Sequence, residues 1–181
     1  MTSKLNSLCV AAALLNLFGT AQAETEMWSL RGNITNTPCT MAVDTVVIGR
    51  VPVAEFNNGG SGIAYAKNFD ITLNGCDMAT LRTASLRFKG RATPGSANTI
   101  LALTEGPDTA SGIGILILLD DAVHGDVGKS VVFDDFELVN FNVSSNNNTF
   151  RFKAYYVRSS EGSSVTPGVA NAIATITLSY T

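Results

Sequence analysis

Short alternations of apolar and polar residues recur along the chain, separated by clusters of glycine, asparagine, proline and serine. Alternation with a period of two places apolar side chains on one face of a β-strand, whereas such clusters are typical of turns. No long stretch has the spacing of an amphipathic helix. The pattern therefore predicts strands that include 28–34, 69–73, 86–88, 150–157 and 170–180.

Residues 113–119 form a nearly continuous apolar run between glycine and aspartate. A run of this length favours a strand that is buried on both faces over a helix of only two turns. Turns are predicted at 57–60, 93–95, 144–148 and 166–168. Many short strands with turns between them indicate an all-β sandwich or barrel, and no repeat or linker divides the chain after its first residues.

The first 23 residues have the order of a cleavable secretory signal. Lys4 precedes an apolar run at 8–18, and the small residues 21–23 follow. The run is too short to span a bilayer, which needs about 20 residues. Cys9 lies at the start of this run, whereas a lipidated cysteine should follow it. We expect residues 1–23 to be removed and the mature protein to begin at Glu24.

Charge and cysteine content narrow the class of protein. Loss of the signal removes Lys4 from 12 basic residues and none of the 15 acidic ones, which leaves a formal charge of −4. A mildly acidic chain lacks the excess of basic residues that binding to nucleic acid requires. Only Cys39 and Cys76 remain, and in an exported protein they predict a disulfide. Together with the single histidine, His124, they are too few for a closed zinc site.

The densest acidic region offers no recognisable catalytic or metal-binding pattern. It contains His124 and the residues Asp120, Asp121, Asp126, Asp134, Asp135 and Glu137. No EF-hand spacing and no G-x-S-x-G elbow occur. We therefore expect a solvated acidic loop with the histidine in a polar turn, and we predict no catalytic residue, no metal and no cofactor.

The last strand has one apolar face. Its inward set is Ala170, Ala172, Ala174, Ile176, Leu178 and Tyr180. No later strand is available to pair with its outer edge, and an exposed apolar edge is one that proteins normally cover. We therefore expect this edge to need a partner.

The segment before Cys39 also has one apolar face. Trp28, Leu30, Gly32 and Ile34 share that face, with a small residue among three bulky ones. Such a segment could fill a groove in a neighbouring molecule that is shallow at one place. It could equally be the first strand of its own domain, and the pattern alone leaves both interpretations open.

Both ends of the chain resemble the type 1 pilins of bacterial chaperone–usher pili. The segment 165–181 resembles the closing strand of that family, with Gly168 fourteenth from the end and Tyr180 penultimate. Leu30 to Ile34, with Gly32 seven residues before Cys39, resembles the amino-terminal donor extension. The segments that resemble the internal strands of the family, in order, are 46–49, 69–76, 112–115 and 152–156.

This resemblance implies an incomplete immunoglobulin-like β-sandwich, the pilin fold, which is completed by a donated strand. Residues 24–36 would be the donor extension and residues 37–181 the pilin domain. A periplasmic chaperone would lend a strand first, and the next subunit would replace it at an outer-membrane usher. The residues implied to donate are Trp28, Leu30, Gly32 and Ile34. The residues implied to form the acceptor groove and to be recognised by the chaperone are Gly168, Ala172, Ala174, Ile176, Leu178 and Tyr180.

The expected function is that of a structural subunit which polymerises with neighbouring pilus subunits at the cell surface. Only four residues precede Trp28 in the mature chain, and this short extension favours a minor or adaptor subunit. The alternative is a carbohydrate-binding fimbrial adhesin, in which Trp28, Tyr155 and Tyr156 could stack on a sugar. Aromatic residues in strands more often pack in a sheet or core, however.

Overall fold

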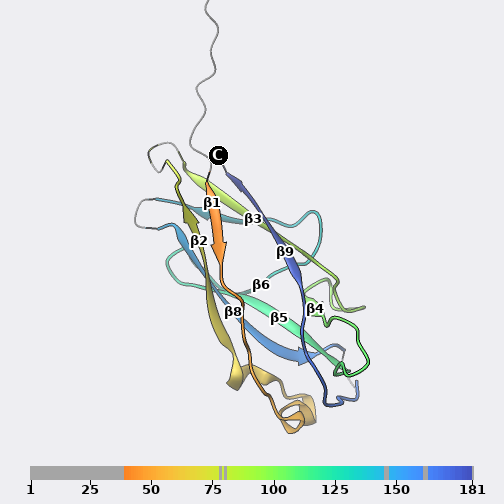
Figure 1. Cartoon of the computed structure of the whole chain (residues 1–181). Helices are drawn as coiled ribbons and strands as arrows, with labels where there is room; N and C mark the ends of the chain where they lie inside the picture. Colours follow the sequence, from red (N-terminus) through yellow and green to blue (C-terminus); the bar gives the residue numbers. More distant parts are fainter. Residues whose placement is uncertain (1–38, 78, 80, 145–146, 161–162, 181) are drawn as a thin grey trace, which may run out of the picture. The chain divides into compact units, whose positions relative to one another are not determined.

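The computed structural model describes residues 39–77, 79, 81–144, 147–160 and 163–180 of the chain. They form nine strands and two short 3-10 helices, which can be followed in Figure 1. No helix in these ranges has the length and apolar character that crossing a membrane requires. The strands are β1 (Thr40–Val43), β2 (Lys67–Asn74), β3 (Thr83–Gly90), β4 (Ile100–Ala102), β5 (Ile113–Asp121), β6 (Asp126–Ser130), β7 (Val139–Asn142), β8 (Thr149–Arg158) and β9 (Ala174–Tyr180), and the helices are η1 (Val53–Gly59) and η2 (Gly62–Tyr65).

The strands form two sheets. The larger sheet has the order β1-β2-β8-β5-β4, and β6 pairs with another part of β5. The smaller sheet has the order β7-β3-β9. All named strand pairs are antiparallel, so each strand can present one face to the core and the other to solvent. The all-β sandwich expected from the alternating pattern is confirmed.

Most of the predicted strands occur where the pattern placed them. Residues 69–73, 86–88 and 150–157 lie within β2, β3 and β8. The apolar run 113–119 lies in β5, which has β8 on one edge and β4 and β6 on the other. Along β5, Ile117 and Leu119 are buried whereas Leu116 and Leu118 are half-buried, so the expected burial on both faces is only partly met.

Three expectations differ from the structure, and a fourth lies outside the described residues. The strand expected at 170–180 begins only at Ala174, because Val169 and Asn171 form backbone hydrogen bonds with the loop at 104–110. Residues 46–49 belong to no strand among the described residues. The turn expected at 57–60 falls mainly within η1, which the sequence pattern did not predict. The strand at 28–34 lies outside the described residues.

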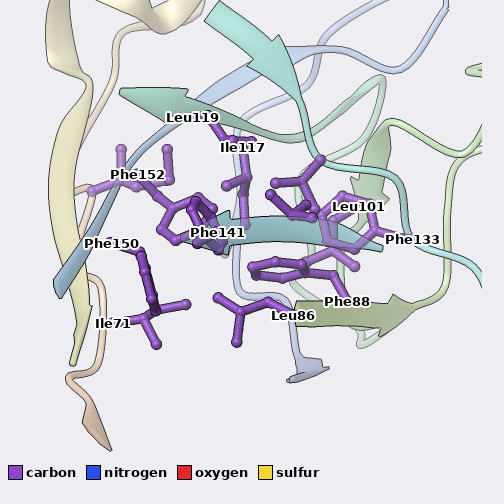
Figure 2. Close-up of a cluster of buried hydrophobic side chains, with 14 of the residues drawn as sticks. Ile71, Leu86, Phe88, Leu101, Ile117, Leu119, Phe133, Phe141, Phe150 and Phe152 are labelled. Carbon is purple, nitrogen blue, oxygen red and sulfur yellow. The ribbon is translucent and has the colours of Figure 1, made fainter. Parts of the chain in front are cut away.

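The two sheets enclose a core that is rich in phenylalanine (Figure 2). Phe141 from the small sheet stacks on Phe150 from the large sheet, with ring centroids 4.1 Å apart. Phe88 and Phe152 also meet across the sandwich, edge to face at 5.4 Å. Burying each side chain of this size contributes roughly 1.5–3 kcal/mol. The largest fully buried side chains are Phe56, Phe88, Phe141, Phe150, Phe152, Ile71, Leu73, Leu86, Leu119 and Val131.

The disulfide expected between Cys39 and Cys76 is present, and its Cα atoms are 4.5 Å apart. It joins the residue before β1 to Cys76, two residues after the end of β2, beside the pairing of Thr40 with Asn74. The bond closes a loop with a sequence separation of 37 residues, which restricts the unfolded chain. It therefore attaches the short strand β1 to the rest of its sheet.

The expectation of a fully solvated acidic region is wrong for Asp121 and His124. Their side chains are only 4% and 2% exposed, and the Nδ1–H group of His124 donates to the Asp121 carboxylate at 2.7 Å. The histidine ring packs against Phe141 and Phe150, with centroids 5.2 and 4.9 Å away. The turn after β5 folds back onto the core, so the histidine is buried although its neighbours in sequence are polar.

The Asp121 carboxylate is held ionised by its hydrogen bonds. Burial raises the pKa of Asp121, but bonds from the His124 ring and from the backbone N–H groups of Arg151 and His124 outweigh it and lower that pKa below 3.8. These N–H donors lie 3.1 and 3.2 Å from the carboxylate oxygens. The carboxylate thus satisfies donors from the turn and from β8 at one point.

We expect Asp121→Asn to lower the free energy of unfolding by about 1–3 kcal/mol at pH 7, because a buried acceptor of several donors is weakened. The folded-state pKa is depressed, so the stability contributed by Asp121 is present above about pH 4 and is lost as the pH falls through its folded pKa. The difference from the unsubstituted protein should therefore shrink toward pH 3.

Denaturant unfolding of the purified protein at several pH values measures this effect. Asp120→Asn is the matched control, because Asp120 pairs with Lys153 at 3.0 Å in a more exposed position and should cost less. The role assigned to Asp121 would be contradicted if both variants lost the same free energy of unfolding. It would also be contradicted if the loss for Asp121→Asn did not change with pH.

Candidate functional site

A groove of about 690 Å³ opens between two segments of chain at one end of the sandwich. One wall is 45–51, which follows β1, and the other is 165–172, which precedes β9. The floor is mainly apolar. Its residues are Phe56, Ala110, Ile113, Ile115 and Tyr156.

The strands on the two sides of the groove, β1 and β9, each have one unpaired edge within the described residues. β1 pairs only with β2, and only over Thr40–Val43, while no pairing of 44–51 is found within the described ranges. β9 pairs with β3 along its whole length and with no other strand of the described part of the chain. Each border therefore offers backbone N–H and C=O groups to a further strand.

The inward face of β9 is less covered than that of its neighbour β3. The inward residues of β3, Ala84, Leu86 and Phe88, are at most 1% exposed. The corresponding residues of β9, Ala174, Ile176 and Leu178, pack against the core but are only partly buried. Tyr180 at the end of the strand is 40% exposed. The apolar face expected along the last strand is confirmed, and it is incompletely buried.

Gly168 is required by a close approach of two backbones. Val169 N–H donates to the Asp108 carbonyl at 2.7 Å, and Ala110 N–H donates to the Val169 carbonyl at 2.9 Å. A Cβ atom on residue 168 would lie 2.5 Å from the Asp108 carbonyl oxygen. Glycine therefore allows the groove wall to pack directly on this loop.

The structure places the predicted acceptor residues along one continuous segment. Gly168 and Ala172 line the groove, whereas Ala174, Ile176, Leu178 and Tyr180 follow in β9. The predicted donor residues Trp28, Leu30, Gly32 and Ile34 lie outside the described residues.

The sequence pattern missed the opposite wall and the floor of the groove. The resemblance to pilins assigns 46–49 to an internal strand, whereas this segment lines the groove and pairs with no strand in the described part of the chain. The pattern identifies Tyr156 only as one of two adjacent aromatic residues in a strand. The alternation of β8 indicates that Tyr156 faces inward, but only the fold shows that the space in front of it is open.

Other chemistry is not apparent in the described part of the chain. Tyr155 and Tyr156 are 7% and 8% exposed, so these rings are not available for stacking on a sugar. Burial raises the pKa of both phenols, which keeps them protonated. No group of three or more metal-ligating side chains was found among the described residues.

Comparison with known proteins agrees with this geometry. Residues 28–181 match the family described as Fimbrial protein. The chain is 30% identical to the Fimbria A protein of Serratia marcescens, over 98% of this chain and 99% of that protein. It is 32% identical to the probable major fimbrial subunit LpfA of Escherichia coli O157:H7, over 82% of this chain and 80% of that protein.

A solved structure has the same fold. The P pilus rod subunit PapA matches with a TM-score of 0.61 and 21% identity, over 86% of this chain and 100% of PapA. A sandwich with one open edge, a family match across the described domain and relatives that are structural fimbrial proteins agree with one another. The chain belongs to the fimbrial subunit family of chaperone–usher pili, and it is a structural protein and not an enzyme.

Proposed function

We propose that this subunit polymerises by donor-strand exchange, with the extension 24–36 of one copy or neighbour occupying the groove of the next subunit. The observation that carries the proposal is the groove between 45–51 and 165–172, which continues into the partly buried face of β9. An added strand would find backbone groups on both sides and an apolar floor between them. Strand addition of this kind takes its affinity from main-chain hydrogen bonds and its specificity from alternate side chains.

The donor face fits the character of the groove. Trp28, Leu30 and Ile34 would each bury an apolar side chain, at roughly 1.5–3 kcal/mol each. Gly32 would pass where the groove is shallow. Several such contacts along one strand support a durable joint before the backbone hydrogen bonds are counted.

Donation to a neighbour is a head-to-tail contact. Such a contact uses different surfaces on the two molecules, so it generates an open filament unless the rotation between subunits closes a ring. The groove of one subunit and the extension of another thereby account for a fibre built from many copies or from several related subunits.

The same groove must be covered before assembly. We infer that residues 1–23 direct export and that a periplasmic chaperone lends a strand beside β9, with Tyr180 and Gly168 at the two ends of the recognised segment. An outer-membrane usher would then permit replacement of that strand by the next subunit. The partly exposed apolar face of β9 supports the need for such cover, because uncovered apolar edges aggregate.

We also propose a minor or adaptor position in the pilus. Only Glu24 to Met27 precede Trp28 in the expected mature chain, which makes the extension short. Glu26 also falls on the apolar face of that extension. A short donor strand with a charge at its start makes less apolar contact with a groove than a longer apolar strand does. Such a strand suits a subunit that forms one joint per fibre better than one that forms the repeated joints of a shaft.

Gly32→Leu should block donation while leaving the subunit able to accept a strand. The added side chain would overpack the shallow part of the next groove, at about 1–3 kcal/mol or more. Asn33→Leu is the matched control, because residue 33 lies on the opposite face of the extension. Incorporation into fibres, measured on fibres sheared from cells, should fall for Gly32→Leu only, with chaperone binding kept by both. Normal incorporation of Gly32→Leu would refute the donor assignment.

Tyr180→Ala should weaken capture by the chaperone and lower the periplasmic yield of the subunit several-fold. The ring is 40% exposed, so a lent strand would complete its burial and contribute about 1–2 kcal/mol. Ser179→Ala is the control, since Ser179 alternates with Tyr180 and faces outward. Quantitative blotting of periplasmic extracts measures the yield, and an unchanged amount of Tyr180→Ala protein would count against this role.

The position in the pilus can be measured directly. Quantitative mass spectrometry of purified fibres should find this chain in few copies relative to the dominant subunit. A fibre composed mainly of this chain would assign it to the shaft instead, as the name of the LpfA relative, probable major fimbrial subunit, describes for that protein.

A further inference from the structure

Tyr156 connects the floor of the groove to one of its walls. The residue lies in β8, near the middle of the large sheet, and its side chain points inward. Its hydroxyl donates to the backbone carbonyl of Ala170 at 2.8 Å. Ala170 belongs to the wall segment 165–172, so this hydrogen bond reaches from the large sheet to the chain that leads into β9.

The Ala170 carbonyl lies on the edge that faces away from the neighbouring loop. The carbonyls of Val169 and Asn171 accept hydrogen bonds from Ala110 and Thr104, at 2.9 and 2.7 Å. In an extended chain, successive residues direct their backbone groups to opposite edges. The carbonyl of the intervening residue therefore points toward the open side, where Tyr156 supplies its hydrogen bond.

We propose that Tyr156 is a positioning residue of the strand-acceptor groove, whose hydroxyl fixes the wall at 168–172 at one distance and direction from the floor and so preserves the shape of the empty groove that admits a strand. The inference rests on the proposed function of donor-strand exchange. Tyr156 acts through the wall and not by contact with the incoming backbone. Because a carbonyl has two lone pairs, Ala170 can keep this bond and still accept an N–H group from a donated strand.

The empty groove needs a restraint on its wall because the lining of the groove is apolar. Ile113, Ile115 and the alanines of the wall would lose water-exposed surface if the wall moved inward, so an empty groove tends to close. The hydrogen bond from the phenol fixes both the distance and the direction of the Ala170 carbonyl, so a wall that slid over the ring to close the groove would have to break it. The phenol is well suited, because its ring is 8% exposed and is fixed in the strand that forms the floor.

Tyr156→Phe tests the proposal because it removes the hydroxyl and keeps the ring. Tyr155→Phe is the matched control: Tyr155 is equally buried on the same strand, and no hydrogen bond of its hydroxyl is found among the described residues. A fluorescent synthetic peptide with the sequence of residues 24–36 is mixed with the full mature chain, freshly separated from its chaperone and kept too dilute for self-association, and the association rate of the peptide is followed by anisotropy. We expect association about tenfold slower for Tyr156→Phe, the factor that corresponds to one lost hydrogen bond, and no change for Tyr155→Phe.

Hydrogen exchange separates positioning from a general loss of stability. The amides of Thr104 and Ala110 donate to the wall, so they should exchange faster in Tyr156→Phe. Amides in the pairing of β2 with β8 should be unaffected. Uniformly faster exchange would overturn the positioning role. If Tyr156→Phe cannot be recovered folded, Tyr156→Met is measured in the same way, because it also fills the space without a hydroxyl.

The outcomes distinguish this inference from the function on which it rests. Peptide binding by the unsubstituted protein with an unchanged rate for Tyr156→Phe would overturn the inference alone. Absence of peptide binding by the unsubstituted protein would overturn donor-strand exchange and, with it, the role of Tyr156. Slower peptide association by Tyr156→Phe, together with faster amide exchange confined to Thr104 and Ala110, would support both donor-strand exchange and the positioning role of Tyr156.

Discussion

An unpaired strand edge beside an incompletely covered apolar face is the constraint on which the behaviour of this protein depends. Backbone N–H and C=O groups must be bonded to something, and apolar side chains are stabilised by leaving water. Within the described residues, β9 meets the first need on its β3 side and not on its outer side. Its inward residues meet the second need only in part. In the donor-strand exchange that we propose, a strand from another molecule would satisfy both at once.

The rest of the sandwich is rigid enough to keep that edge in place. Phenylalanines from both sheets interlock in the core, and the Cys39–Cys76 disulfide secures β1 to β2. The Asp121 carboxylate adds a polar anchor by accepting hydrogen bonds from the turn after β5 and from β8. A well-packed body with one unfilled place suits a polymer subunit, because the joint can form without refolding the domain.

The groove wall at 165–172 is tightly packed at one residue and borders open space two residues later. At Gly168 the backbone approaches the loop at 106–110 so closely that no side chain would fit. At Ala170 the same segment is attached to Tyr156 across an open groove. Small residues along this wall would leave space for the side chains of the donated strand that we propose, while the hydrogen bonds on the other edge of the wall fix its path.

The sequence alone determined the fold class, most strand positions and the apolar face of the last strand. These features follow from alternation and from turn residues, which are local properties of the chain. The disulfide was also predictable, because only two cysteines follow the expected signal. The resemblance of both termini to pilins predicted the family.

Only the tertiary structure decided where chain segments that are distant in sequence meet. The pattern gave no indication that 46–49, which the resemblance to pilins assigned to an internal strand, lines the groove unpaired. It assigned His124 to a solvated turn, although that turn folds onto two phenylalanines. It gave Tyr155 and Tyr156 no separate roles. A side-chain period specifies which face a residue occupies, whereas the three-dimensional arrangement specifies what lies in front of that face.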